Sequence, residues 1–129
     1  MYICINDLAA AIRYCGKKMY FDRETYEISP DPGRECLAEP YRFTEIPTIN
    51  YEYIRRDFLA ANNLLNRHRI DEYAKDPHKF HIFINDKGIY WYNAYIDHEF
   101  EQIKKLAAQW CAENGINYTY KEGKANEGN

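Results

Sequence analysis

The clearest pattern of apolar and polar positions in the chain lies between Asp97 and Ile116. Its apolar residues recur every three or four positions, the spacing of one buried face of an α-helix: Phe100, Ile103, Ala107, Trp110. Asp97 and Glu99 lie where the first turn of this helix is expected. Carboxylates there are stabilised by the positive end of the helix dipole. Gly115 is suited to the left-handed conformation that closes a last turn, with Ile116 folding back toward Cys111. The pattern therefore predicts a long amphipathic helix that ends at Gly115.

The N-terminal third alternates short β-prone segments with turns. Residues 2–5 predict a strand, and Asn6 or Asp7 is the expected N-cap of a helix that Gly16 ends. The apolar stripe of that helix consists of Leu8, Ala11, Ile12 and Cys15. Residues 18–21 and 26–29 flank a polar turn and predict a β-hairpin.

The prolines and the middle of the chain predict a connection followed by helices. Residues 30–40 lack periodicity and predict an irregular connection, and residues 41–46 predict a third strand before Pro47. Asn50 is the expected N-cap of a helix over 51–67. We expect its inner face to comprise Ile54, Phe58, Ala61 and Leu65, and its outer face Arg55, Arg56 and Asn62 or Asn63. Residues 70–75 predict a further helical turn or two.

Two interpretations compete for residues 78–95. Phe80, Ile82 and Ile84 alternate, and the turn-forming residues 85–88 precede the aromatic run 89–92, which favours a hairpin. In the helical alternative Asp76 is the N-cap, Pro77 the first helical residue and Gly88 the stop, and the final helix starts early, near Tyr92. Periodicity alone does not choose between them.

Length and composition predict one α+β domain over residues 1–120, helix-rich, with an N-terminal β-hairpin and a long C-terminal amphipathic helix. Residues 121–129 are almost devoid of apolar side chains and predict a disordered tail. The chain has 129 residues, thirteen tyrosines and a formal charge of −3 spread along its length. This balance makes nucleic acid an unlikely partner. No apolar run approaches the length of a membrane span, so we expect no membrane association.

The four cysteines are scattered, without a C-x-x-C pair: Cys4, Cys15, Cys36, Cys111. The N-terminus also lacks the pattern of a secretory signal peptide. We therefore expect reduced thiols and a cytoplasmic location, with buried thiols favoured over two disulfides.

Several segments resemble a bacterial family of unknown role, uncharacterised protein family zero-one-five-eight. Its pattern combines a hairpin Y-L-N-x-x-T-G-E-V, an I-P segment, an Asp-Phe pair and a helix ending W-C-x-E-N-G-I. The corresponding segments here are Tyr20–Ile28, Ile46-Pro47, Asp57-Phe58 and Trp110–Ile116. Tyr26 replaces the glycine of that hairpin, which predicts a turn that does not require a positive φ there. The resemblance implies the helical alternative for residues 77–87, and it supplies neither a catalytic residue nor a cofactor.

Candidate catalytic groups are few. His78 and His81 would share a face of a helix, where two imidazoles suit a metal, but no third ligand is identifiable. Cys36 lies beside Arg34, which favours a thiolate, although an ordinary exposed cysteine is the favoured interpretation. The phosphate-binding, dinucleotide-binding and serine hydrolase motifs are absent. We accordingly predict no catalytic residue, no metal site and no cofactor.

Aromatic residues provide the best candidate for binding. Tyr90, Trp91, Tyr92 and Tyr95 are of the types enriched at the centres of protein interfaces, although such rings more often serve the core. The sequence therefore predicts a protein–protein interaction or regulatory module without catalysis. The alternatives are a small metal-dependent hydrolase that uses the two histidines, and a nucleic-acid-binding regulator that uses the arginines between residues 55 and 79. The identity of the partner and the oligomeric state are not specified.

Overall fold

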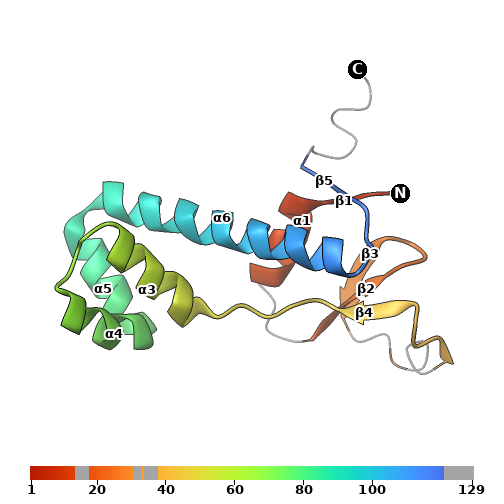
Figure 1. Ribbon diagram of the computed structural model, residues 1–129, viewed down its shortest axis with the longest axis horizontal. Helices are drawn as coiled ribbons and strands as arrows, with labels where there is room; N and C mark the ends of the chain where they lie inside the picture. The colour runs from red at the N-terminus through yellow and green to blue at the C-terminus, as the bar shows by residue number, and fades with distance from the viewer. Residues whose placement is uncertain (14–17, 31–32, 34–37, 121–129) are drawn as a thin grey trace, which may run out of the picture. The chain divides into compact units, whose positions relative to one another are not determined.

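The computed structural model describes residues 1–13, 18–30, 33 and 38–120. Contacts within it divide the chain into two compact units (Figure 1). The first comprises Met1–Ile49 together with the chain from Ile103 onward, and the second comprises Asn50–Gln102. The long helix α6 (Ile89–Glu113) begins in the second unit and ends in the first. Each unit has its own core.

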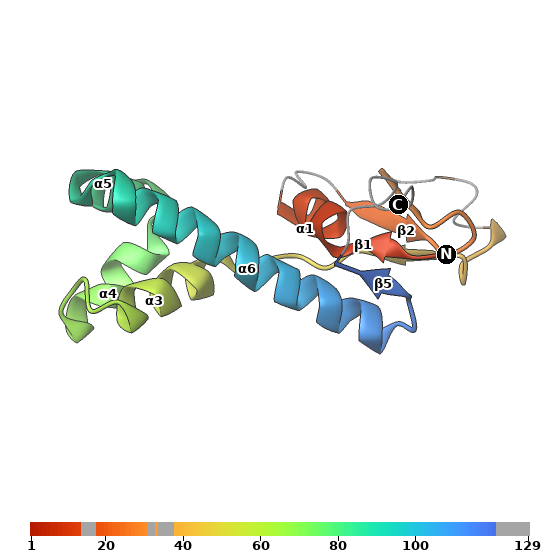
Figure 2. The same cartoon turned by 90° about the horizontal axis from the view of Figure 1, so that it is seen from above.

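In its described residues, the first unit is built from short strands, the helix α1 and the end of α6. Its other elements are β1 (Ile3–Cys4), α1 (Ile5–Arg13), β2 (Met19–Asp22), β3 (Glu27–Pro30), β4 (Phe43–Glu45) and β5 (Tyr118–Thr119). The strands β3, β2 and β4 form an antiparallel sheet in that order, and β1 pairs in parallel with β5. Figure 2 shows α1 beside β2. The buried apolar residues of the unit include Ile5, Leu8, Ile12, Phe21, Ile103, Ala107 and Cys111.

The second unit is helical: α3 (Tyr51–Ala61), α4 (Arg67–Lys75), α5 (Pro77–Lys87) and the first part of α6. Asn50 caps α3, because its side chain accepts a hydrogen bond from the backbone N–H of Tyr53. Asp76 ends α4 and caps α5 by accepting from the N–H of Lys79, and Pro77 occupies the first turn of α5. The buried apolar residues here are Ile54, Phe58, Leu59, Ile70, Ala74, Phe80, Ile84 and Tyr95.

The C-terminal end of α6 closes as the sequence predicts. Gly115 has φ +67°, and its N–H donates to the carbonyl of Ala112. The N–H of Ile116 donates to the carbonyl of Cys111 over 2.9 Å. These two bonds form a Schellman motif, which satisfies carbonyls that the last turn would otherwise leave unpaired.

The hairpin interpretation of residues 78–95 is wrong, and the helical alternative is confirmed. A strand would place Phe80, Ile82 and Ile84 on one face, whereas the helix buries Phe80 and Ile84 and leaves Ile82 half exposed. The N-cap, the N-terminal proline and Gly88 at φ +106° together outweigh the strand preference of the aromatic run.

Three helix boundaries differ from the sequence-based expectation. Because α6 begins at Ile89, Asp97 and Glu99 lie inside the helix and not at the positive end of its dipole. The first helix starts at Ile5, so neither expected N-cap residue precedes it. Helix α3 ends at Ala61. Asn62 is its C-cap, and the Asn62 side-chain amide donates a hydrogen bond to the carbonyl of Phe58. Gly16 and the expected tail 121–129 lie outside the described residues.

Side-chain burial corrects two further expectations. Arg55, expected in solvent, is buried, and its Nε donates to the carbonyl of Ala74 over 2.7 Å. Ala61, expected to face inward, is exposed. Tyr26 has φ +60°, so the hairpin turn does require a left-handed residue at the position where the resembling family has glycine. The α+β class, the N-terminal hairpin and the long C-terminal helix are confirmed.

Candidate functional site

The four aromatic residues singled out by sequence lie at the start of α6 but differ in exposure. Tyr90 is 72% exposed and Tyr92 is 36% exposed, whereas Tyr95 is 1% exposed. Trp91 is intermediate, with its ring 5.2 Å from that of Tyr90 and 6.2 Å from that of Phe58, both edge-on. The structure therefore separates a core residue, Tyr95, from an exposed aromatic group that Trp91 connects to the core.

Ile89 adds to this exposed group, since it is also 72% exposed. We refer to the adjacent residues Ile89 and Tyr90 as the aromatic surface; Tyr92, two positions after Tyr90, points about 200° away around the helix. Isolated exposed apolar residues are normal on protein surfaces, but two adjacent large ones at one helix start are less usual. In the sequence, Ile89 is marked by its position directly after Gly88. An apolar residue at the very start of a helix can precede the residues that form the buried face.

Tyr95 belongs to a buried polar cluster. Its hydroxyl donates to Glu99 Oε2 over 2.9 Å, and both residues are buried. Burial, together with the neighbouring Glu99 carboxylate, raises the pKa of the Tyr95 phenol far above its usual range, so the hydroxyl keeps its proton. This arrangement fixes side chains in the core and is structural.

Arg56 and Lys79, two basic residues of the second unit, are engaged with carboxylates. Arg56 donates from Nη2 to Glu52 over 2.8 Å and from Nε to Asp71 over 2.9 Å, and these bonds raise its pKa. Lys79 bonds Glu72, whose pKa is lowered mainly by that contact. These pairings reduce the charge that these side chains can offer to a phosphate backbone.

His78 and His81 lie on α5, as the helical alternative requires, and both are exposed. Within the described part of the chain, no three His, Cys, Asp or Glu side chains gather as a metal-binding set, so the two imidazoles have no third ligand beside them there. Cys36 and Arg34 lie outside the described residues. Cys4 and Cys111 are free and buried, and burial raises the pKa of the Cys111 thiol to about 11. None of the helices in the described ranges is both long and apolar enough to cross a membrane.

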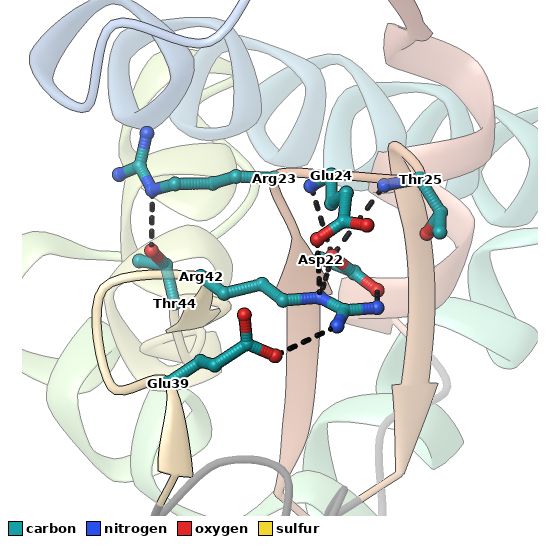
Figure 3. Close-up of polar contacts among 7 residues, drawn as sticks. All are labelled: Asp22, Arg23, Glu24, Thr25, Glu39, Arg42 and Thr44. Carbon is teal, nitrogen blue, oxygen red and sulfur yellow. Dashed lines mark hydrogen bonds and ion pairs between the residues drawn. The ribbon is translucent and has the colours of Figure 1, made fainter.

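In the first unit, a polar network orders the turn of the hairpin (Figure 3). The Arg42 guanidinium donates two bonds of 2.8 Å to the two carboxylate oxygens of Asp22, and a third, of 3.0 Å, to Glu39. Asp22 Oδ1 also accepts from the backbone N–H groups of Glu24 and Thr25. Arg42, the largest influence, and these N–H groups hold the pKa of the Asp22 carboxyl well below its usual range.

The hairpin also holds the end of α6. Arg23 donates from Nε to Thr44 Oγ1 over 3.1 Å and from Nη1 to the carbonyl of Asn114 over 2.9 Å. A guanidinium at this position complements the negative end of the helix dipole. The Phe21 ring meets that of Trp110 edge-on at 6.1 Å. The hairpin and the end of α6 therefore form one contacting assembly.

Next to this assembly, α1 and the hairpin border an open groove of about 420 Å³. We call it the α1–β3 groove; its lining residues are Ile3, Asp7, Ala11, Met19, Tyr26, Glu27 and Ile28. The walls are mainly apolar, with Asp7 and Glu27 as the charged groups. Neither carboxylate has an ion-pair partner among the described residues. The lining residues come from four consecutive elements and the hairpin turn, so the groove depends on how these elements pack and has no local sequence signal.

No family model matches the chain, and no curated protein or solved structure is significantly similar to it.

Proposed function

We propose that this protein acts by binding another protein through the aromatic surface at the start of α6. The observation that supports the proposal is the 72% exposure of both Ile89 and Tyr90. Burying these side chains in a partner would remove apolar area from water, which is the main favourable term in association. Trp91 restrains the Tyr90 ring through its edge-on contact, so less side-chain entropy is lost on binding.

The proposal includes no catalytic step. The perturbed pKa values in the described residues belong to groups in hydrogen bonds of the core or the turn (Tyr95, Asp22), to ion pairs on helices, or to the buried thiol of Cys111. Perturbed groups of this kind often serve structure. The two alternatives, a metal-dependent hydrolase and a nucleic-acid-binding regulator, draw no support from the exposed histidine pair or from the carboxylate-paired Arg56 and Lys79.

We also propose kinship with uncharacterised protein family zero-one-five-eight and, with it, a bacterial source and a cytoplasmic location. Two of the segments that carry the resemblance contact each other: Arg23 and Phe21 of the hairpin meet Asn114 and Trp110 of the closing helix. A shared pattern at two contacting segments is what a common structural unit would require. The free thiols of Cys4 and Cys111 support a reducing compartment.

Site-specific photo-crosslinking in the native host tests the binding surface. We expect p-benzoylphenylalanine at position 90 to capture one protein repeatedly, and the same residue at position 41 to capture none. Tyr41 is a suitable control because it is 92% exposed and belongs to the first unit. With the captured protein purified, we expect Tyr90→Ser to weaken binding by about 2 kcal/mol, as loss of an interface hot spot does.

Thermal unfolding separates this effect from misfolding. Because Ile89 and Tyr90 are exposed, we expect the variant Ile89→Ser/Tyr90→Ser to unfold within about 2 °C of the unmodified protein, as surface substitutions usually do. Equal capture from positions 90 and 41, or no capture from either, would contradict the proposal.

A further inference from the structure

The strand β3 has one free edge among the described residues. It is the outer strand of the β3–β2–β4 sheet and pairs only with β2. The backbone groups on the other side of such a strand can form hydrogen bonds with a strand from another chain. Which groups point outward follows from the register of the sheet.

The hydrogen bonds between β2 and β4 set that register. Arg23 donates from its backbone N–H to the carbonyl of Arg42, and Ile46 donates to the carbonyl of Met19. Met19 and Arg23 are separated by an even number of positions, so every second residue of β2 directs its backbone groups toward β4. Tyr20 is one position from Met19, so its backbone N–H and C=O point the other way, toward β3.

Tyr20 lies opposite Ser29. The backbone of Ser29 therefore forms hydrogen bonds with β2. The neighbouring residue Ile28 directs its N–H and C=O toward the free edge. Pro30 follows with an outward carbonyl but no N–H. Ile28 offers both a donor and an acceptor, while Pro30 limits how far a pairing strand can extend.

The free edge and the α1–β3 groove coincide at Ile28. Its side chain contributes to the groove, together with Met19 of β2 and Ala11 of α1. Side chains of a strand added beside Ile28 would alternate, and every second one would face α1 across the groove. The groove therefore offers an apolar space where an added strand would place its side chains.

The charges of the groove favour a cationic occupant. Asp7 is exposed on α1 and Glu27 is exposed on β3, and neither has an ion-pair partner among the described residues. Two carboxylates with no ion-pair partner in the described ranges, at the sides of an apolar groove, complement a Lys or Arg side chain flanked by apolar ones. The polar network around Asp22 keeps the turn before β3 in place without a ligand, so little ordering of the site would accompany binding.

We propose that the α1–β3 groove binds an extended, basic segment of another protein, which adds as a strand to the free edge of β3. The segment bonds Ile28 through its backbone, places apolar side chains against Ala11 and Met19, and directs a Lys or Arg toward Asp7 and Glu27. This site lies in the first unit and does not depend on the aromatic surface, which lies in the second.

Selection from a displayed library of random octapeptides against the full chain tests the proposal. We expect the selected peptides to alternate apolar and polar residues and to carry at least one Lys or Arg. Replacing that residue by Glu should weaken binding, and so should the protein variant Asp7→Asn/Glu27→Gln, by about three- to tenfold, because exposed charge pairs contribute little each. The matched control is Asp86→Asn/Asp97→Asn, which removes the same charge from exposed positions of the second unit.

Methylation of single peptide nitrogens tests the strand geometry. We expect methyl groups at every second position to abolish binding and those at the positions between to leave it unchanged, since only alternate N–H groups face β3. The proposal is overturned by peptides that bind Asp7→Asn/Glu27→Gln as tightly as the unmodified protein. It is also overturned if the effect of methylation does not alternate along the peptide. The absence of enriched peptides overturns it too, as does a stable self-associated form in which the β3 edges of two copies pair.

The failure of this proposal and that of the proposed function are distinguishable. Peptides that lose binding in Ile89→Ser/Tyr90→Ser but keep it in Asp7→Asn/Glu27→Gln support the aromatic surface and overturn the groove. The reverse result supports the groove alone.

Discussion

The hydroxyl of Tyr26 accepts a hydrogen bond from the backbone N–H of Asn117, 3.2 Å away and 91 positions further along the chain. Tyr26 reaches this position in a left-handed backbone conformation, at φ +60°, which is unfavourable for a residue with a side chain. Its ring also meets Phe21 edge-on at 5.0 Å. The strained backbone of Tyr26 is therefore accompanied by one contact within the hairpin and one long-range contact, neither of which glycine could make.

Removing only the hydroxyl measures one of these contacts. We expect Tyr26→Phe to lower the free energy of unfolding by about 0.5 kcal/mol, at the low end for a hydrogen bond, because water can reach the exposed N–H of Asn117. Tyr41→Phe is the control, since Tyr41 is almost fully exposed. Urea unfolding checks both variants. Equal stability of Tyr26→Phe and the unmodified protein would show that water fully replaces the bond.

The Asp22–Arg42 pair makes stability dependent on acid. The pKa of Asp22 is lowered in the folded state, so the unfolded chain binds a proton more readily. The pair's contribution is complete above the unfolded pKa of about 4 and declines as the pH falls from there toward the folded value. We expect unfolding free energies in urea to show a smaller loss between pH 6 and pH 3 for Asp22→Asn than for the unmodified protein.

At neutral pH the same substitution should lower the free energy of unfolding. Asparagine keeps an oxygen for the turn N–H groups of Glu24 and Thr25 but loses the charge facing Arg42. We expect Asp22→Asn to destabilise the protein by about 1.5–3 kcal/mol, typical of hydrogen bonds to charged groups. Glu45→Gln is the control, because Glu45 lies 4.0 Å from exposed Lys18 and such a pair contributes little. Similar losses for the two variants would contradict a special role of Asp22.

The buried phenol of Tyr95 predicts a loss of stability in alkali. Burial and the Glu99 carboxylate raise its pKa in the folded state, so its contribution is complete below the unfolded pKa of about 10 and declines as the pH rises. We expect Tyr95→Phe to flatten this decline between pH 9 and pH 11. The variant should also lose about 1–3 kcal/mol at pH 7, because the buried Glu99 loses the hydrogen bond from the Tyr95 hydroxyl. An unchanged alkaline slope would contradict the assignment.

The last turn of α6 offers a test of backbone conformation without packing. Gly115 has φ +67°, and a Cβ there would meet no atom within 4 Å. We therefore expect Gly115→Ala to cost about 1 kcal/mol through the left-handed conformation alone, and Gly115→Asn to cost less. Thermal unfolding of both variants provides the measurement. A cost above about 3 kcal/mol would indicate a packing role that this geometry does not show.

Local signals were sufficient where one short segment decides the structure. Gly115, Asn50 and the Asp76-Pro77 pair mark helix ends by satisfying backbone groups within a few residues, and each does so in the structure. The alternation of residues 80–84 was a weaker signal than these caps, because a helix can also bury two of the three apolar residues.

Burial and long-range pairing have no signal within a single short segment. Arg55 looks like a surface residue in sequence, yet the Ala74 carbonyl that accepts its hydrogen bond comes from another helix. Tyr90 and Tyr95 are alike in sequence, and only the packing against Phe58 and Glu99 makes one a core residue. Chemical type does not specify which neighbours a side chain acquires when distant segments fold together.

By itself, the sequence determined the α+β class, the hairpin and the closing helix of this protein, because hydrogen bonds and apolar spacing within single segments specify such elements. Only the tertiary structure decided that Asp22 meets Arg42, that Tyr26 meets Asn117 and that α1 and β3 border a groove. The first two relationships close loops of 20 and 91 positions, and all three depend on the packing of the whole unit.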